Sequence, residues 1–220
     1  MTLTSPHDVV MVFAKAPHPG RVKTRLLPLL GAEGAAAFHA RLIEHTLATA
    51  HRADHGTLEL HADPADDKFM RECADRYAIK LVQQQGDDLG ARMYHAFRAV
   101  LSDGRYHTAI LIGTDCPELA PSHLRRASNA LRDSDDAVFI PTEDGGYALI
   151  GLKRCDPRLF QDIAWGSAAV MRQTREQLNA LGWRWSELQT LWDIDRPPDY
   201  ERLVSNGLLE RIESGTGNSE

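Results

Sequence analysis

Residues 8–25 read Asp8-Val-Val-Met-Val-Phe-Ala-Lys-Ala-Pro-His-Pro-Gly-Arg-Val-Lys-Thr-Arg25. The stretch begins with a nearly continuous apolar run over residues 8–14, which is typical of a strand that is buried on both faces of a sheet. A loop with Pro17, Pro19 and Gly20 follows the run. An Ala-rich segment from about residue 32 to residue 51 then predicts a helix. This order favours a fold in which strands alternate with helices around a parallel sheet.

The same alternation continues along the chain. The apolar patterns predict further strands over residues 57–61, 79–83, 108–113, 137–140, 147–152 and 183–187, and helices over residues 64–77, 87–101, 121–132, 167–181 and 197–204. We therefore expect an α/β fold, a three-layer α/β/α sandwich with a mainly parallel central sheet. No linker or repeat divides the sequence, which predicts a single domain over residues 1–212. The last eight residues, 213–220, read as a disordered tail.

Composition excludes several classes of protein. The 220 residues are 43% hydrophobic and 25% charged, which is the globular average and excludes a disordered or fibrous chain. No uninterrupted apolar run approaches the ~18 residues of a membrane span, and the first residues lack a secretory signal pattern. The cysteines, Cys73, Cys116 and Cys155, form no CxxC pair. Their spacing argues against a disulfide framework and predicts a cytoplasmic protein.

Charge is distributed unevenly along the sequence. The 25 basic and 31 acidic residues give a net charge of −6, which disfavours a nucleic-acid partner or an anionic membrane. No acidic residue lies between Asp8 and Glu33, and this gap contains four cations: Lys15, Arg21, Lys23 and Arg25. A basic segment in an acidic chain indicates a small anionic ligand.

The loop that carries these cations has the composition of a phosphate site. Prolines stiffen it, Gly20 permits close backbone approach, and free amides add to the positive charge. It contains neither a GxxxxGK[ST] loop nor a GxGxxG fingerprint. The alternative is a solvated surface loop, and the sequence leaves both interpretations open.

Carboxylates follow two of the predicted strands. Asp115 ends an apolar strand, and Asp193 and Asp195 are two positions apart, so an extended segment turns both to one side. The carboxyl ends of parallel strands meet at one edge, where ligands bind. Mg²⁺ takes one or two carboxylates and completes its shell with water and phosphate oxygens. The alternatives are a turn cap at Asp115 and helix-start acids at residues 193 and 195.

Five ordered motifs resemble those of the DUF2064 family of bacterial proteins, which is often labelled glycosyltransferase-like. The motifs span residues 8–205 and are Phe13–Leu26 (FAKAPHPGRVKTRL), Gln85–Met93 (QGDDLGARM), Gly113–Pro117 (GTDCP), Glu143–Gly151 (EDGGYALIG) and Asp193–Asp199 (DIDRPPD). Two positions depart from the usual pattern, since Arg196 stands in place of Thr and Gly166 in place of Ser.

The resemblance implies the nucleotide-diphospho-sugar transferase (GT-A) fold and a set of site residues. It assigns catalysis to Lys15, Lys23 and Asp115. It assigns the nucleotide and its phosphates to Lys15, Gly20, Arg21, Lys23, Thr24, Arg25 and Asp88. It assigns the acceptor to Glu143, Asp144, Gly145, Gly146 and Trp165. It assigns a metal ion, Mg²⁺ or Mn²⁺, to Asp115, Asp193 and Asp195.

These assignments predict a Mg²⁺-dependent transferase that uses a nucleotide donor and a small-molecule acceptor. The donor is a nucleoside triphosphate for nucleotidyl transfer or a nucleotide sugar for glycosyl transfer. The lack of a DxD motif after residue 113 favours the former, and the family label favours the latter. The alternative is a non-catalytic nucleotide-sensing module, against which the three carboxylates argue because phosphate binding alone does not need them.

Overall fold

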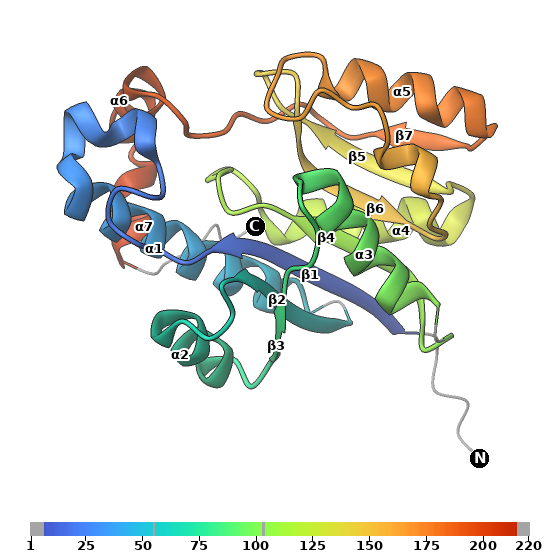
Figure 1. The fold of residues 1–220 in the computed structure, drawn as a ribbon, viewed down its shortest axis with the longest axis horizontal. Coiled ribbons are helices and arrows are strands. Elements are labelled where there is room, and N and C mark those ends of the chain that lie inside the picture. Colours follow the sequence, from blue (N-terminus) through green and yellow to red (C-terminus); the bar gives the residue numbers. More distant parts are fainter. Residues whose placement is uncertain (1–6, 55, 103, 215–220) are drawn as a thin grey trace.

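The computed structural model describes residues 7–54, 56–102 and 104–214 and shows a seven-stranded sheet between helical layers (Figure 1). The strands are β1 (His7–Lys15), β2 (Thr57–Asp63), β3 (Lys80–Gln83), β4 (Tyr106–Ile112), β5 (Ala137–Pro141), β6 (Tyr147–Leu152) and β7 (Trp185–Glu187). The α-helices are α1 (Leu27–Ala53), α2 (Lys68–Arg76), α3 (Leu89–Leu101), α4 (Pro121–Asp133), α5 (Val170–Leu181), α6 (Pro197–Ser205) and α7 (Leu208–Ser214), and 3-10 turns span Thr24–Leu26 and Pro157–Phe160.

The strand order is β3-β2-β1-β4-β6-β5-β7, and only β6 runs antiparallel to its neighbours β4 and β5. The prediction of a mainly parallel α/β sheet is confirmed. The chain leaves β1 for β2 and β3 on one side and then crosses to β4 on the other side. The carboxyl ends of β1 and β4 therefore diverge at a topological switch point, where open α/β sheets bind ligands.

The two faces of the sheet are covered by different helices. Val10 and Val12 of β1 pack with buried residues of α1, α2 and α4, whereas Met11 and Phe13 pack with those of α3 and α5. Successive side chains of a strand point to opposite faces. A central strand with helices on both sides is therefore apolar at nearly every position, as the sequence predicted for β1.

A third apolar cluster, here called the end cluster, lies beyond the sheet. The start of α1 meets α6 and α7 there (Figure 1). Its buried members are Leu26, Phe38, Leu42, Trp192, Ile194, Leu203, Leu208 and Ile212. The cluster anchors the end of the basic loop (residues 15–25) through Leu26. It anchors the acidic segment (residues 192–195) through Trp192 and Ile194, so both segments are held at one end of the sheet.

Helix α1 is the one helix of the described chain that is long and apolar enough to cross a membrane, judged by length and composition alone. Its side chains Ile43, Leu47 and Ala50 are buried in the core against the sheet. Packing in the protein interior therefore accounts for part of its apolar character.

Several element boundaries differ from the predicted ones. Helix α1 begins at Leu27 and is interrupted at Gly31, whose φ of 68° is not helical. Helix α2 begins at Lys68 rather than residue 64 because the Asp67 side chain accepts hydrogen bonds from the amides of Phe69 and Met70. Helix α7 was not predicted, and it extends into the first two residues of the predicted tail, while residues 215–220 lie outside the described part.

Candidate functional site

A cavity of about 500 Å³ lies at the carboxyl ends of β1 and β4. Its charged lining residues are Lys15, Arg25, Asp115, Asp144, Asp193 and Asp195. An apolar and aromatic wall faces them, made by Phe13, Leu89, Tyr147 and Trp165. The cavity therefore joins the basic loop to the three carboxylates selected from the sequence, at the edge of the sheet that topology favours for a ligand.

The acidic segment runs directly beside Asp115. The amide of Ile194 donates a hydrogen bond of 2.8 Å to the Asp115 carbonyl oxygen. Ile194 is fully buried in the end cluster, while Asp193 and Asp195 on either side of it line the cavity. The alternation predicted for this segment is confirmed.

Lys23 and Asp115 form an ion pair in which Nζ lies 2.8 Å from Oδ1. The Lys23 side chain is only 4% exposed, whereas that of Asp115 is 53% exposed and faces the cavity. Nζ also donates a hydrogen bond to the carbonyl oxygen of Ile194. Desolvation by the surrounding protein opposes ionisation of Asp115. The charge and hydrogen bond of Lys23, together with smaller contributions from His39 and Thr114, outweigh this effect and lower the pKa of the carboxyl.

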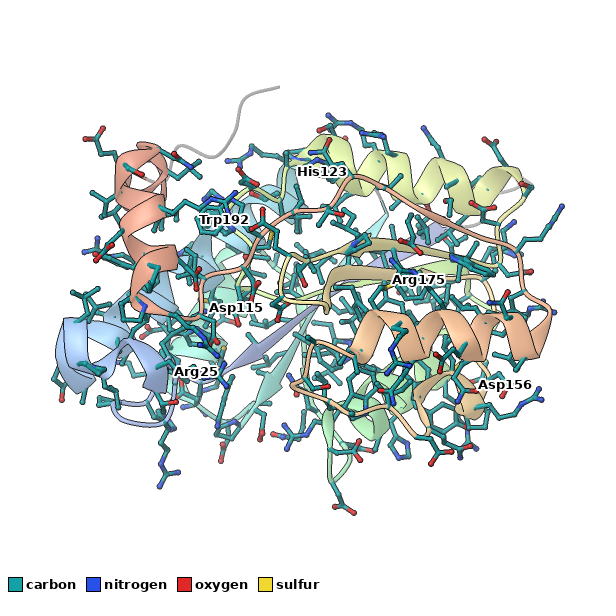
Figure 2. All side chains as sticks on the ribbon, turned by 90° about the horizontal axis from the view of Figure 1, so that it is seen from above. Arg25, Asp115, His123, Asp156, Arg175 and Trp192 are labelled. Carbon is teal, nitrogen blue, oxygen red and sulfur yellow. The ribbon has the colours of Figure 1, made fainter. Side chains whose placement is uncertain are left out.

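Arg25 pairs with Asp195 on the more open side of the cavity. Figure 2 shows Arg25 and Asp115 near each other toward one end of the molecule, with Arg175 and Asp156 toward the other end. Two of the four cations of the loop thus hold two of the three carboxylates. Lys15 is exposed, lines the cavity and has no ion-pair partner within the described ranges.

Asp193 has no cationic partner in the described part of the chain. Burial, together with the neighbouring carboxylates of Asp144 and Asp115, raises its pKa to about 6. Asp144 is itself fixed, because it accepts hydrogen bonds from the Thr142 hydroxyl at 2.5 Å and from the Gly146 amide at 2.9 Å. Mutual repulsion of this kind favours binding of a cation.

The donor set consists of carboxylate oxygens, which suit a hard divalent ion such as Mg²⁺ or Mn²⁺. No group of three or more His, Cys, Asp or Glu side chains in the part that the structure describes is arranged to hold a metal. Asp115 and Asp193 supply two carboxylates at one cavity, and Mg²⁺ needs only one or two when a substrate adds phosphate oxygens.

Other predicted phosphate ligands lie away from the cavity. Gly20, Arg21 and Thr24 are exposed, and neither they nor Lys23 line it. Asp88 caps α3, because it accepts a 2.7 Å hydrogen bond from the Ala91 amide. The structure therefore narrows the cations that face the cavity to Lys15 and Arg25.

Some of the residues predicted to bind the acceptor line the cavity, and others do not. Asp144, Gly146 and Trp165 line the cavity. Glu143 points away from it and forms a two-pronged ion pair with Arg202 of α6, with distances of 2.8 and 3.2 Å. Gly145 has φ of 91°, and a Cβ there would lie 2.4 Å from a backbone oxygen of residue 168, so its role is steric.

His39 and Gln84 line the cavity but were missed by the sequence interpretation. His39 Nε2 lies 3.0 Å from the Lys15 carbonyl oxygen and must donate to it, which leaves Nδ1 buried without a partner in the described part. Burial lowers the pKa of His39. The buried face of α1 also carries His45, Thr46 and Thr49, so polarity on that face did not single out His39. Gln84 donates to the carbonyl oxygens of Ala14 and His61 and so holds the ends of two strands.

Residues 46–167 match the family described as "Uncharacterized protein conserved in bacteria (DUF2064)". This stretch is more than half of the 220 residues. The chain belongs to the DUF2064 family. A search of curated proteins gave no match to this DUF2064 chain.

Solved structures show which proteins share the fold of this DUF2064 chain. A candidate nucleotide-diphospho-sugar transferase from Desulfovibrio desulfuricans G20 is 28% identical, with a TM-score of 0.80 over 95% of this chain and 96% of that one. The 4-diphosphocytidyl-2C-methyl-D-erythritol synthase of Anaerococcus prevotii DSM 20548 is 11% identical, with a TM-score of 0.61 over 94% and 100% of the two chains.

A glucosyl-3-phosphoglycerate synthase from Mycobacterium tuberculosis, solved with Mn²⁺, UDP and glucosyl-3-phosphoglycerate, is also 11% identical. Its TM-score is 0.55 over 98% of this chain and 82% of that one. The predicted nucleotide-diphospho-sugar transferase (GT-A) type of fold is confirmed. This fold supports both nucleotidyl and glycosyl transfer, so the fold alone does not choose the reaction.

Proposed function

We propose that this protein is a transferase that binds a nucleotide donor together with Mg²⁺ or Mn²⁺ in the cavity at the carboxyl ends of β1 and β4. The observation that carries the proposal is that Lys15 and Arg25 face the same cavity as Asp115 and Asp193. Basic side chains bind the phosphate oxygens of a nucleotide, and carboxylates bind the hard divalent ion that accompanies them. The cavity offers both kinds of group.

Each charged side chain has a distinct part in this proposal. Lys15, which is exposed and lies at the end of β1, binds donor phosphates, and Arg25 turns to them from Asp195. Asp115 and Asp193 hold the divalent ion, which supplies neutralisation of the charge that develops on phosphate oxygens. Lys23 orients Asp115 from beneath the cavity.

The aromatic wall places the uncharged parts of the substrates. Trp165 and Tyr147 contact each other edge to face with ring centroids 6.5 Å apart, and both line the cavity. Flat apolar walls suit the faces of bases and sugars. Asp144, which is fixed by Thr142 and Gly146, offers a carboxylate oxygen to acceptor hydroxyls.

Two reactions are consistent with this arrangement. In nucleotidyl transfer, an acceptor oxygen attacks the α-phosphorus of a nucleoside triphosphate and pyrophosphate leaves. In glycosyl transfer, the acceptor attacks the sugar carbon of a nucleotide sugar and a nucleoside diphosphate leaves. Both reactions gather negative charge on phosphate oxygens, so the same residues serve either through positioning and electrostatics. Nucleotidyl transfer is favoured because Asp115 stands alone after β4, without a second acid two positions away.

A thermal-shift panel of nucleoside triphosphates and nucleotide sugars with Mg²⁺ tests the proposal. A ligand at about 100 times its Kd stabilises a protein by ~2.7 kcal/mol, which gives a clear shift. Phosphorus NMR with the nucleotide that binds then identifies the product, either pyrophosphate or a nucleoside diphosphate. Absence of any nucleotide-dependent shift contradicts the proposal, and binding without turnover supports a nucleotide-sensing module instead.

A further inference from the structure

Lys23 is held in place by its backbone as well as by its side chain. Its φ of 46° and ψ of 42° are left-handed, a conformation that costs a non-glycine residue about 1 kcal/mol or more. The side chain is 4% exposed and directs Nζ to two oxygen atoms, Asp115 Oδ1 and the Ile194 carbonyl. The fold thus places a buried ammonium group between the end of β4 and the acidic segment.

This position has the chemistry of a divalent cation site. Hard divalent cations take carboxylate and carbonyl oxygens, and the same kinds of oxygen surround Lys23 Nζ. A lysine ammonium is a compact point charge, so it can neutralise one carboxylate in place of a metal ion. Asp193 forms no ion pair in the described part of the chain, and Lys23 lowers its pKa less than burial and the two neighbouring carboxylates raise it, which is consistent with one positive charge among several carboxylates.

We propose that the ammonium group of Lys23 competes with the divalent cation for Asp115, so that the cation binds tightly only when phosphate groups draw Lys23 away. The inference rests on the proposed function. Moving Lys23 off Asp115 without a new anion would leave a buried cation unpaired, which is costly. Donor phosphates supply that anion at the cavity that Lys15 and Arg25 already face. Cation and phosphate therefore raise each other's affinity by the same factor.

Arg21 provides the matched control within the same loop. It lies two residues from Lys23, is exposed, does not line the cavity and has no ion-pair partner in the described part of the chain. Removing its charge changes the net charge of the loop as much as removing that of Lys23. Of these two side chains, that of Lys23 pairs with Asp115, and the described structure shows no such pair for Arg21.

The experiment measures binding of Mn²⁺ alone, by electron paramagnetic resonance of the free ion. Lys23→Gln should raise the affinity for Mn²⁺ at least about tenfold above wild type, because one good ion-pair partner is worth about 1.4 kcal/mol or more. Arg21→Gln should change it less than twofold, and Lys23→Arg, which keeps the charge, should not raise it. Equal Mn²⁺ affinity in wild type and Lys23→Gln overturns the proposal.

A second measurement uses the wild-type protein and needs no folded variant. The rate at which an amine-reactive reagent labels Lys23, read by mass spectrometry, should rise as Mn²⁺ binds, with exposed Lys68 as the internal reference. An unchanged rate at saturating Mn²⁺ overturns the competition. Pyrophosphate and nucleotides that fail to bind any form of the protein would instead contradict the proposed function. The two failures are therefore distinguishable.

Discussion

Two aspartates at opposite ends of neighbouring strands are stabilised in opposite ways. Asp8, near the start of β1, is 2% exposed and accepts hydrogen bonds from the Thr108 hydroxyl at 2.6 Å, the Ser128 hydroxyl and Arg132 at 2.9 Å. These partners come from β4 and α4, so the carboxylate ties a strand and a helix to β1. Its charge is satisfied within the protein.

The carboxylates at the other end of the same strands are not satisfied to the same degree. Asp115 pairs with Lys23 and otherwise accepts a long hydrogen bond of 3.5 Å from the Thr114 hydroxyl within the described residues. Asp193 lies beside Asp115 and Asp144 with a pKa raised to about 6. Such perturbed groups cluster at functional sites because the arrangement that binds a ligand costs stability in its absence. Under the proposed function, the comparison separates a structural aspartate from aspartates that bind a ligand, and the predictions below test that separation.

The largest expected effect is on stability, at the structural end. Asp8→Ala should lower the free energy of unfolding by about 3 kcal/mol, because it removes a carboxylate that accepts hydrogen bonds from two buried hydroxyl groups, at about 1–3 kcal/mol each. Chemical denaturation of wild type and variant measures the difference. Asp8→Asn keeps one acceptor oxygen and should lose less. A loss under about 1 kcal/mol for Asp8→Ala would show that this end of the sheet does not depend on the carboxylate.

Asp115→Asn should lower turnover of the nucleotide by about 10²-fold or more, the scale of losing one preorganised electrostatic contact. The variant keeps the shape of the side chain and removes only its charge. Steady-state rates with the nucleotide identified by thermal shift measure the loss. Glu143→Gln is the control, because Glu143 is an acid of the same edge that points away from the cavity to Arg202. Similar losses in both variants would remove the distinction between lining and non-lining acids.

Much of the fold was predictable because its strands are buried on both faces. Runs such as residues 108–113 admit few other structures, and Pro121 at the first position of α4 marks a helix start. Helix α7 was not predictable in the same way. It has seven residues, and Leu208 and Ile212 acquire their apolar partners only when α1 and α6 are in place.

The place of the site was predictable, but the pairing of its charges was not. The carboxyl-end rule selected Lys15, Asp115 and Asp195, and all three line one cavity. Sequence does not distinguish Lys15, which is free to meet a ligand, from Lys23, which a left-handed backbone turns beneath the cavity. Which cation pairs with a carboxylate and which one faces the cavity depends on tertiary contacts that the local spacing of residues does not encode.

Lys15→Ala should weaken binding of pyrophosphate with Mg²⁺ by about tenfold, because one charge-assisted hydrogen bond contributes about 1.5 kcal/mol or more. Arg21→Ala should weaken it less than twofold, since Arg21 lies outside the cavity. Isothermal titration calorimetry measures both affinities at constant salt. Equal losses would indicate a diffuse effect of loop charge rather than a contact by Lys15.

The smallest expected effect is a gain in stability. Asp193 keeps its proton in the folded protein up to about pH 6, whereas the unfolded chain releases it near pH 4. Between these values the folded state binds more protons, so the free energy of unfolding contributed by Asp193 falls as pH rises and stays low above pH 6. The Asn side chain of Asp193→Asn does not titrate, so the variant should be more stable than wild type at pH 7 and should lose that advantage near pH 4. Because solvent screens this half-buried position, the expected gain at pH 7 is about 1 kcal/mol. Denaturation from pH 4 to pH 7 measures the difference between the two proteins. A difference that does not vary with pH would mean that neither burial nor the neighbouring carboxylates raise the pKa of Asp193, and the contrast with Asp8 would then rest on Asp115 alone.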